Sequence, residues 1–140
     1  MNTKKLVTAF VVVFILLEVT NYLVNVVILS STYSNPEISK IFRPVAEMDA
    51  KMWMMWIADL VYSFFFVFIF VKGYENKGIM EGVRYGIYIG IFIQFMAAVA
   101  QHVVYPLPAS LAVQWFIYGL IESVIFGVAA AMIYKPKTAA

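Results

Sequence analysis

The 140-residue chain is far more apolar than a water-soluble domain. Hydrophobic residues make up 64% and charged residues 13%, whereas soluble domains contain roughly 45–50% apolar and about 25% charged residues. The net charge of +2 is too small to indicate nucleic-acid binding, and the lack of cysteine excludes disulfides, thiolate metal sites and cysteine nucleophiles. The composition therefore predicts an integral membrane protein that contacts the lipid bilayer.

Four apolar runs cover residues 6–29, 52–71, 85–105 and 107–134. Each is at least as long as the roughly 18 to 20 residues that a helix needs to span a bilayer. We therefore expect a single all-α domain over residues 1–140, an integral membrane four-helix antiparallel bundle.

The first run resembles a signal peptide in following Lys4 and Lys5, but it is too long and carries Glu18 and Asn21. We expect it to be a membrane span. Basic loops remain cytoplasmic, and most of the basic residues flank the runs on one side. These are Lys4, Lys5, Lys72, Lys77, Arg84, Lys135 and Lys137. Both termini are therefore expected to be cytoplasmic.

The two longer connections predict different structures. Residues 72–84 form a short loop with several turn-forming residues, so we expect the second and third runs to form a tight antiparallel hairpin. The outer loop, residues 30–51, contains Asn35 followed by Pro36 and Glu37, which is typical of a helix start. This predicts a short interfacial helix from about Asn35 to Ala46, either as a simple cover or as a lid over a pocket.

Polar side chains inside the apolar runs predict a buried site. An ionised residue at a helix centre costs roughly 2.5–3.5 kcal/mol on insertion scales, yet three runs carry a carboxylate. Helical periodicity places these acids and the amides of the first and third runs on faces that should meet. The predicted ligand or proton pocket comprises Glu18, Asn21, Asn25, Asp59, Gln94, Gln101 and Glu122, with Tyr22 and His102 at its mouth.

The runs contain no basic residue to neutralise these acids. A proton, a cation or a small polar solute is therefore the expected guest. The alternative is structural, since protonated acids and amides can also hold helices together.

Two ridges of small residues predict close helix contacts. The third run carries Gly82, Gly86 and Gly90, and the fourth carries Gly119, Ser123 and Gly127. We expect one ridge to serve the internal hairpin and the other to join a second copy, giving a homo-oligomer. Packing against a larger membrane complex, as an accessory or assembly subunit, is the alternative.

The chain also carries a weak internal repeat. The spacing of Glu18 and Asn25 matches that of Gln94 and Gln101, and Asp59 and Glu122 stand equally far before Lys72 and Lys135. This pattern predicts two repeated helical hairpins, although chance explains it almost as well.

Aromatic residues gather near the ends of the runs, as in the aromatic belts of membrane proteins. They are Trp53, Trp56, Trp115, Tyr105 and Tyr118 on the outer side, and Tyr74, Tyr85 and Tyr134 on the inner side. No nucleophile, phosphate-binding or metal motif is present, so we expect neither a metal nor a cofactor. An enzyme acting on a lipid, with two carboxylates as acid and base, is the less favoured reading.

The KGYENKG and EGVRYG segments and the YPLP turn resemble a group of small bacterial four-span membrane proteins of unknown function. The resemblance covers residues 33–136. It implies a four-helix protein of the bacterial inner membrane and implies no activity.

Overall fold

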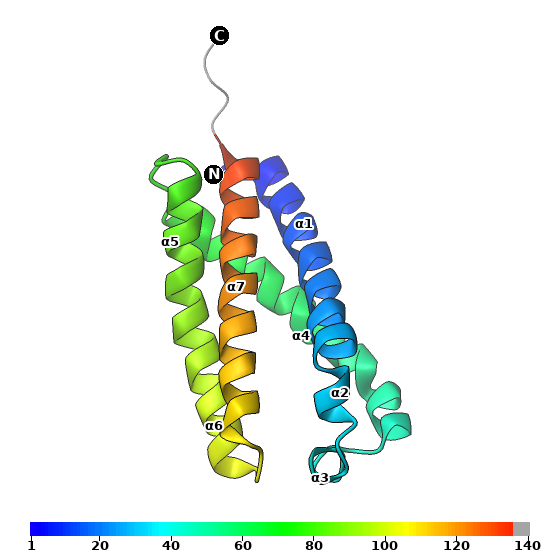
Figure 1. Cartoon of the computed structure of the whole chain (residues 1–140). Coiled ribbons are helices and arrows are strands. Elements are labelled where there is room, and N and C mark those ends of the chain that lie inside the picture. Colours follow the sequence, from blue (N-terminus) through cyan, green and yellow to red (C-terminus); the bar gives the residue numbers. More distant parts are fainter. Residues whose placement is uncertain (136–140) are drawn as a thin grey trace.

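The computed structural model describes residues 1–135, which fold into helices (Figure 1). Four helical stretches are long and apolar enough to cross a membrane: Thr3–Ile28, Val45–Lys72, Ile79–Val104 and Ala109–Tyr134. The predicted all-helical class and its four long apolar helices are confirmed. Of the basic residues used to orient the chain, Lys137 lies outside the described residues.

Two of the long stretches contain a π-helical segment. The elements in chain order are α1 (Thr3–Tyr22), η1 (Leu23–Ile28), α2 (Ser30–Tyr33), α3 (Pro36–Ser39), α4 (Val45–Lys72), α5 (Ile79–Gly90), η2 (Ile91–Phe95), α6 (Met96–Val104) and α7 (Ala109–Tyr134). The π segments continue α1 and α5 without a break. Each therefore changes which residues share a face beyond it.

Capping residues explain several helix starts. The Asn2 side chain accepts a hydrogen bond from Lys5 N at 3.1 Å at the start of α1. Pro44 immediately precedes α4, which begins at Val45 rather than at the predicted Met52. The added turns are polar, so an apolar pattern could not reveal them. The outer loop is correspondingly shorter than expected.

The short outer helix starts where predicted but ends early. The Asn35 side chain accepts a hydrogen bond from Glu37 N at 3.0 Å and caps α3. The expected extension to Ala46 is wrong, because α3 ends at Ser39 and α4 begins after Pro44. A residue that precedes proline is disfavoured in the helical conformation, so the two helices cannot merge.

Helices α5 and α7 form the closest contact in the bundle. Gly82, Gly86 and Gly127 are buried between them, and a Cβ atom on Gly82 or Gly86 would overlap the backbone carbonyl of Gly127 or Ser123. The two small-residue ridges therefore pack against each other. The expectation that one ridge stays free for a second copy is wrong, because the antiparallel pair brings both small faces together.

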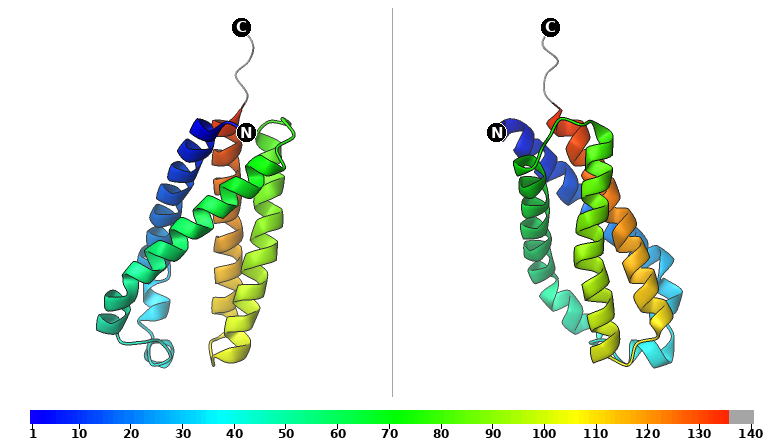
Figure 2. Two further views of the ribbon diagram at one scale, coloured as in Figure 1. Left: turned by 180° about the vertical axis from the view of Figure 1, so that it is seen from behind. Right: turned by 90° about the vertical axis from the view of Figure 1, so that its left-hand side faces the viewer.

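Helix α4 crosses the bundle obliquely and diverges from α5 and α7 at one end (Figure 2). Its buried residues, Ser63, Phe66, Val67, Phe70 and Val71, all lie in its second half. The expected tight hairpin of α4 and α5 is wrong. Bulky aromatic side chains on α4 provide no small ridge for close approach, and the two helices meet mainly at Tyr85, whose hydroxyl donates to the Phe66 carbonyl at 2.6 Å.

The bundle is thus closed at one end and splayed at the other. The closed end holds the main apolar core, which includes Leu6, Val13, Phe70 and Phe126. It also holds both ends of the described chain, because Asn2 N donates to the Tyr134 hydroxyl at 3.0 Å. The splayed end holds α2, α3 and the turn between α6 and α7.

The two sequential hairpins differ in packing. Helices α5 and α7 lie in close backbone contact, whereas α1 and α4 make fewer close approaches. The repeat therefore stays a prediction.

Candidate ligand-binding cavity

A cavity of about 340 Å³, here called the central cavity, lies among α1, η1, α4, η2 and α7. It exists because the first half of α4 stands away from η2 and α7. Its polar lining residues are Asn21, Asn25, Asp59, Tyr62, Gln94, Trp115, Tyr118 and Glu122. Five of these eight belong to the pocket predicted from the sequence.

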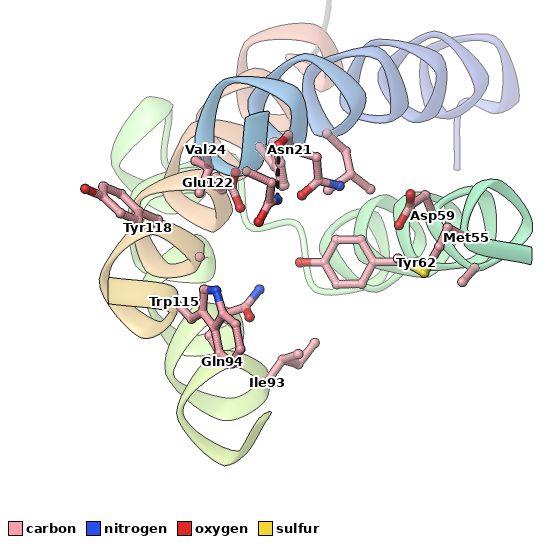
Figure 3. A pocket seen from close by; sticks show the side chains of 15 residues that line it. Asn21, Val24, Met55, Asp59, Tyr62, Ile93, Gln94, Trp115, Tyr118 and Glu122 are labelled. Atoms are coloured by element: carbon pink, nitrogen blue, oxygen red, sulfur yellow. Dashed lines mark hydrogen bonds between the residues drawn. The ribbon is translucent and has the colours of Figure 1, made fainter. Parts of the chain in front are cut away.

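Polar side chains from four elements converge on the central cavity (Figure 3). Asp59 and Tyr62 project from α4, Asn21 from α1, Gln94 from η2 and Glu122 from α7. The two carboxyl groups thus come from different helices across the cavity. Within residues 1–135, the lining contains no lysine, arginine or histidine.

A second hollow, here called the side groove, lies between α1 and the first half of α4. It measures about 650 Å³ and is lined by Glu18 and Tyr22 together with the basic residues Arg43 and Lys51. Glu18 and Asp59 both line the side groove. Asp59 lines both hollows, so it links Glu18 in the side groove, where Arg43 and Lys51 also lie, with Glu122 in the central cavity.

Several buried polar atoms have no protein partner within the described part of the chain. They are Glu18 Oε1, Glu122 Oε1, the Tyr62 hydroxyl and Ser63 Oγ. Leaving such a group unsatisfied costs roughly 1–3 kcal/mol. Because Glu122 and Tyr62 both line the central cavity, a bound guest can supply their hydrogen-bond partners there.

Gly119 makes room for the Gln94 side chain. A Cβ atom on Gly119 would lie 2.5 Å from Gln94 Cδ, well inside van der Waals contact. Gln94 therefore lies over the bare backbone of α7, one turn from Glu122. This contact joins the small-residue ridge to the cavity wall.

Two predicted residues lie elsewhere. Gln101 is exposed and lines neither hollow, and His102 Nδ1 donates to the Leu107 carbonyl at 2.7 Å, in the turn between α6 and α7. Their expected place in the pocket is wrong. The π-helical η2 inserts about one residue, or roughly 100° of rotation, between Gly90 and the residues of α6. Ala98, not Gln101, consequently continues the buried face.

A hydrogen-bonded network ties the outer loop to the cavity wall. The Tyr33 hydroxyl donates to Asn25 Oδ1 at 2.9 Å and accepts from Trp115 Nε1 at 2.8 Å. Burial raises the pKa of the Tyr33 phenol, and the hydrogen bond from Trp115 opposes this in part. The phenol consequently remains a donor at neutral pH. Tyr33 links α2 to two residues that line the central cavity.

Sequence reasoning missed three aromatic members of the lining. The sequence pattern predicts an aromatic belt for Trp115 and Tyr118 and no role for Tyr62, yet all three are partly buried and line the cavity. Tyr62 follows Asp59 by three residues, and Trp115 precedes Glu122 by seven. Both spacings place the aromatic side chain on the face of the acid, so this signal was present.

Compared with protein-family models, with curated proteins and with solved structures, the chain matches none. The function must therefore be argued from the geometry of the cavity.

Proposed function

We propose that the protein is a four-span membrane protein whose central cavity binds a proton, a cation or a small polar solute and supports its movement or sensing. The observation that carries the proposal is the buried, unpartnered Glu122 Oε1 on a cavity wall that also carries Asp59 and no basic residue among the described lining. Packing alone would favour partnered acids, because an unpaired buried polar atom destabilises the fold.

The proposed setting is a bacterial inner membrane with both termini cytoplasmic. The resemblance noted in the sequence favours that membrane, and the distribution of basic residues favours that orientation. The splayed end then faces outward, and the main apolar core closes the cytoplasmic end. A small polar solute would reach the acids from the outside through the splayed end.

Protonation and cation binding are coupled in such a site. A carboxyl group without a cationic neighbour in a poorly solvated setting favours its neutral form. An arriving cation favours the carboxylate, so the acid releases one proton as the cation binds. Asn21, Asn25 and Gln94 then supply neutral oxygen ligands around the charge.

A binding assay on the protein in lipid nanodiscs tests the proposal, with methylammonium as the cation probe. We expect Glu122→Gln to weaken binding and to abolish the accompanying proton release. Glu47→Gln is the matched control, because Glu47 is exposed and pairs with Arg43 at 3.4 Å outside the cavity. Unchanged binding and proton release in Glu122→Gln would contradict a functional cavity.

The second candidate is an accessory or assembly subunit of a larger membrane complex. It is favoured by the first half of α4, where large side chains such as Trp53, Met54 and Trp56 are more than half exposed. Exposed apolar surface of this kind suits contact with either lipid or a partner helix. Gentle extraction followed by sizing and mass spectrometry separates the two: a stoichiometric hetero-complex supports the accessory role, and a protein without other subunits opposes it.

A further inference from the structure

An apolar groove of about 200 Å³, here called the tail groove, runs between α4 and α5 beside the central cavity. Its walls are Val61, Tyr62, Phe65, Phe66 and Ile69 of α4 and Tyr85, Ile89 and Ile93 in the α5–η2 stretch. These residues recur at helical spacing on each side, so the groove follows the two helices. It exists because α4 has no small-residue ridge to bring it against α5.

The tail groove adjoins the central cavity. Tyr62 and Ile93 line both of them, and Figure 3 shows these two side chains projecting from α4 and η2. From there the groove runs toward the closed end of the bundle, because Ile69 lies further along α4 and Tyr85 earlier in α5. The separation of Val61 and Ile69 corresponds to about 12 Å along the helix axis.

The two adjoining spaces have opposite chemistry. The central cavity contains two carboxyl groups and three carboxamides, whereas the tail groove is walled by aliphatic and aromatic side chains. The Tyr85 hydroxyl is already engaged by the Phe66 carbonyl. A purely polar guest would fill only the cavity, and an alcohol head group would carry no charge to favour the carboxylate form of the acids. An ammonium head group with a hydrocarbon chain satisfies both spaces.

We propose that the guest of the central cavity is an amphiphilic amine, whose ammonium group lies between Asp59 and Glu122 and whose hydrocarbon chain occupies the tail groove. This inference rests on the proposed function, because it names the ligand class of the same cavity. The guest enters sideways from the bilayer between α4 and η2, where the two helices diverge. The length of the groove suits a chain of the size of an octyl group.

The test compares octylammonium, ethylammonium and octanol with the full-length protein in lipid nanodiscs, with empty nanodiscs subtracted. We expect Glu122→Gln to weaken both ammonium ions. Val61→Trp, which fills the groove from a half-exposed position, should weaken octylammonium about tenfold, or about 1.4 kcal/mol, and leave ethylammonium unchanged. Val113→Trp is the matched control, because Val113 is 54% exposed on α7 and lines neither space.

A second measurement locates the chain directly. An octylammonium probe with a photoreactive diazirine at the middle of its chain should label peptides that contain Phe65, Ile69 or Ile89, and Glu122→Gln should reduce that labelling. Labelling spread over the lipid-facing helices and unchanged by Glu122→Gln would overturn the inference. Equal effects of Val61→Trp on both ammonium ions, or octanol binding as well as octylammonium, would overturn it too.

These experiments distinguish failure of the amphiphilic-amine inference from failure of the proposed function of the cavity. If ethylammonium binds and needs Glu122 but the photoreactive probe does not label the groove, the amphiphile inference fails and the polar cavity stands. If neither ammonium ion binds and Glu122→Gln changes nothing, both proposals fail.

Discussion

The α5–α7 contact gives the most specific stability prediction. Gly86 of α5 packs against the backbone of α7 and not against a side chain that could move aside. A Cβ atom there would lie 2.5 Å from Val124 Cα and closer still to the Ser123 carbonyl oxygen. Ordinary contact needs roughly 1 Å more, so Gly86→Ala forces the two helices apart. Overpacking of this kind lowers the free energy of unfolding by up to about 3 kcal/mol, whereas the better helix propensity of alanine raises it by about 1 kcal/mol. The expected net loss is about 2 kcal/mol.

Unfolding of Gly86→Ala in mixed detergent micelles measures this loss. Gly73→Ala is the control, because the nearest atom to its added Cβ is the Ile69 carbonyl oxygen at 3.8 Å, an ordinary contact. We expect that control to stay within about 0.5 kcal/mol of the parent protein. If Gly86→Ala is as stable as Gly73→Ala, the α5–α7 contact does not have the closeness described above.

Three further predictions rest on individual contacts, and a fourth rests on the distribution of basic residues. Tyr33→Phe removes two hydrogen bonds, each worth about 1 kcal/mol, and should therefore speed hydrogen exchange in the outer loop, whereas Tyr88→Phe at an exposed position should not. Equal exchange rates in the two variants would show that the Tyr33 hydrogen bonds do not hold the outer loop. Glu81→Ala should lower the free energy of unfolding by about 2 kcal/mol, because the Glu81 carboxylate accepts hydrogen bonds from two backbone N–H groups of the α4–α5 loop at 2.6 and 2.8 Å; an unchanged unfolding midpoint would refute this role. Gly119→Ala should displace the Gln94 side chain and weaken methylammonium binding with little loss of stability, and a large loss would show that Gln94 cannot move. Reporter fusions at the two chain ends should both report the cytoplasm, and an external signal from either would overturn the proposed orientation.

The helices were readable from the sequence because an apolar run of fixed length has one stable form in a bilayer. The acids and amides could also be identified from the sequence, since each is a polar residue within an apolar run. Asn21, Asp59 and Glu122 accordingly line the cavity where helical periodicity expected them. Such single-helix features depend only on local sequence.

The errors arose where the outcome depended on local backbone geometry that the sequence does not mark, or on the packing of two elements. Nothing in residues 91–95 marks a π-helical segment, yet that segment turned Gln101 away from the cavity. The two glycine ridges can be recognised in the sequence, but the sequence of a ridge does not show which helix packs against it. The oblique course of α4 follows from the absence of a ridge on that helix, which became informative only once α5 and α7 had paired.

The asymmetry between small and bulky faces accounts for both the stability of the bundle and its hollow. The glycines allow α5 and α7 to pack with their backbones in contact. The aromatic side chains of α4 prevent that helix from packing against α5 and α7 along its whole length. Because α4 is buried only in its second half, its tilt can change without disturbing the α5–α7 contact. Such a change would alter the separation of Asp59 and Glu122 and the width of the tail groove together. If the cavity binds a cation as proposed, the position of α4 sets both the affinity for that cation and its access from the bilayer.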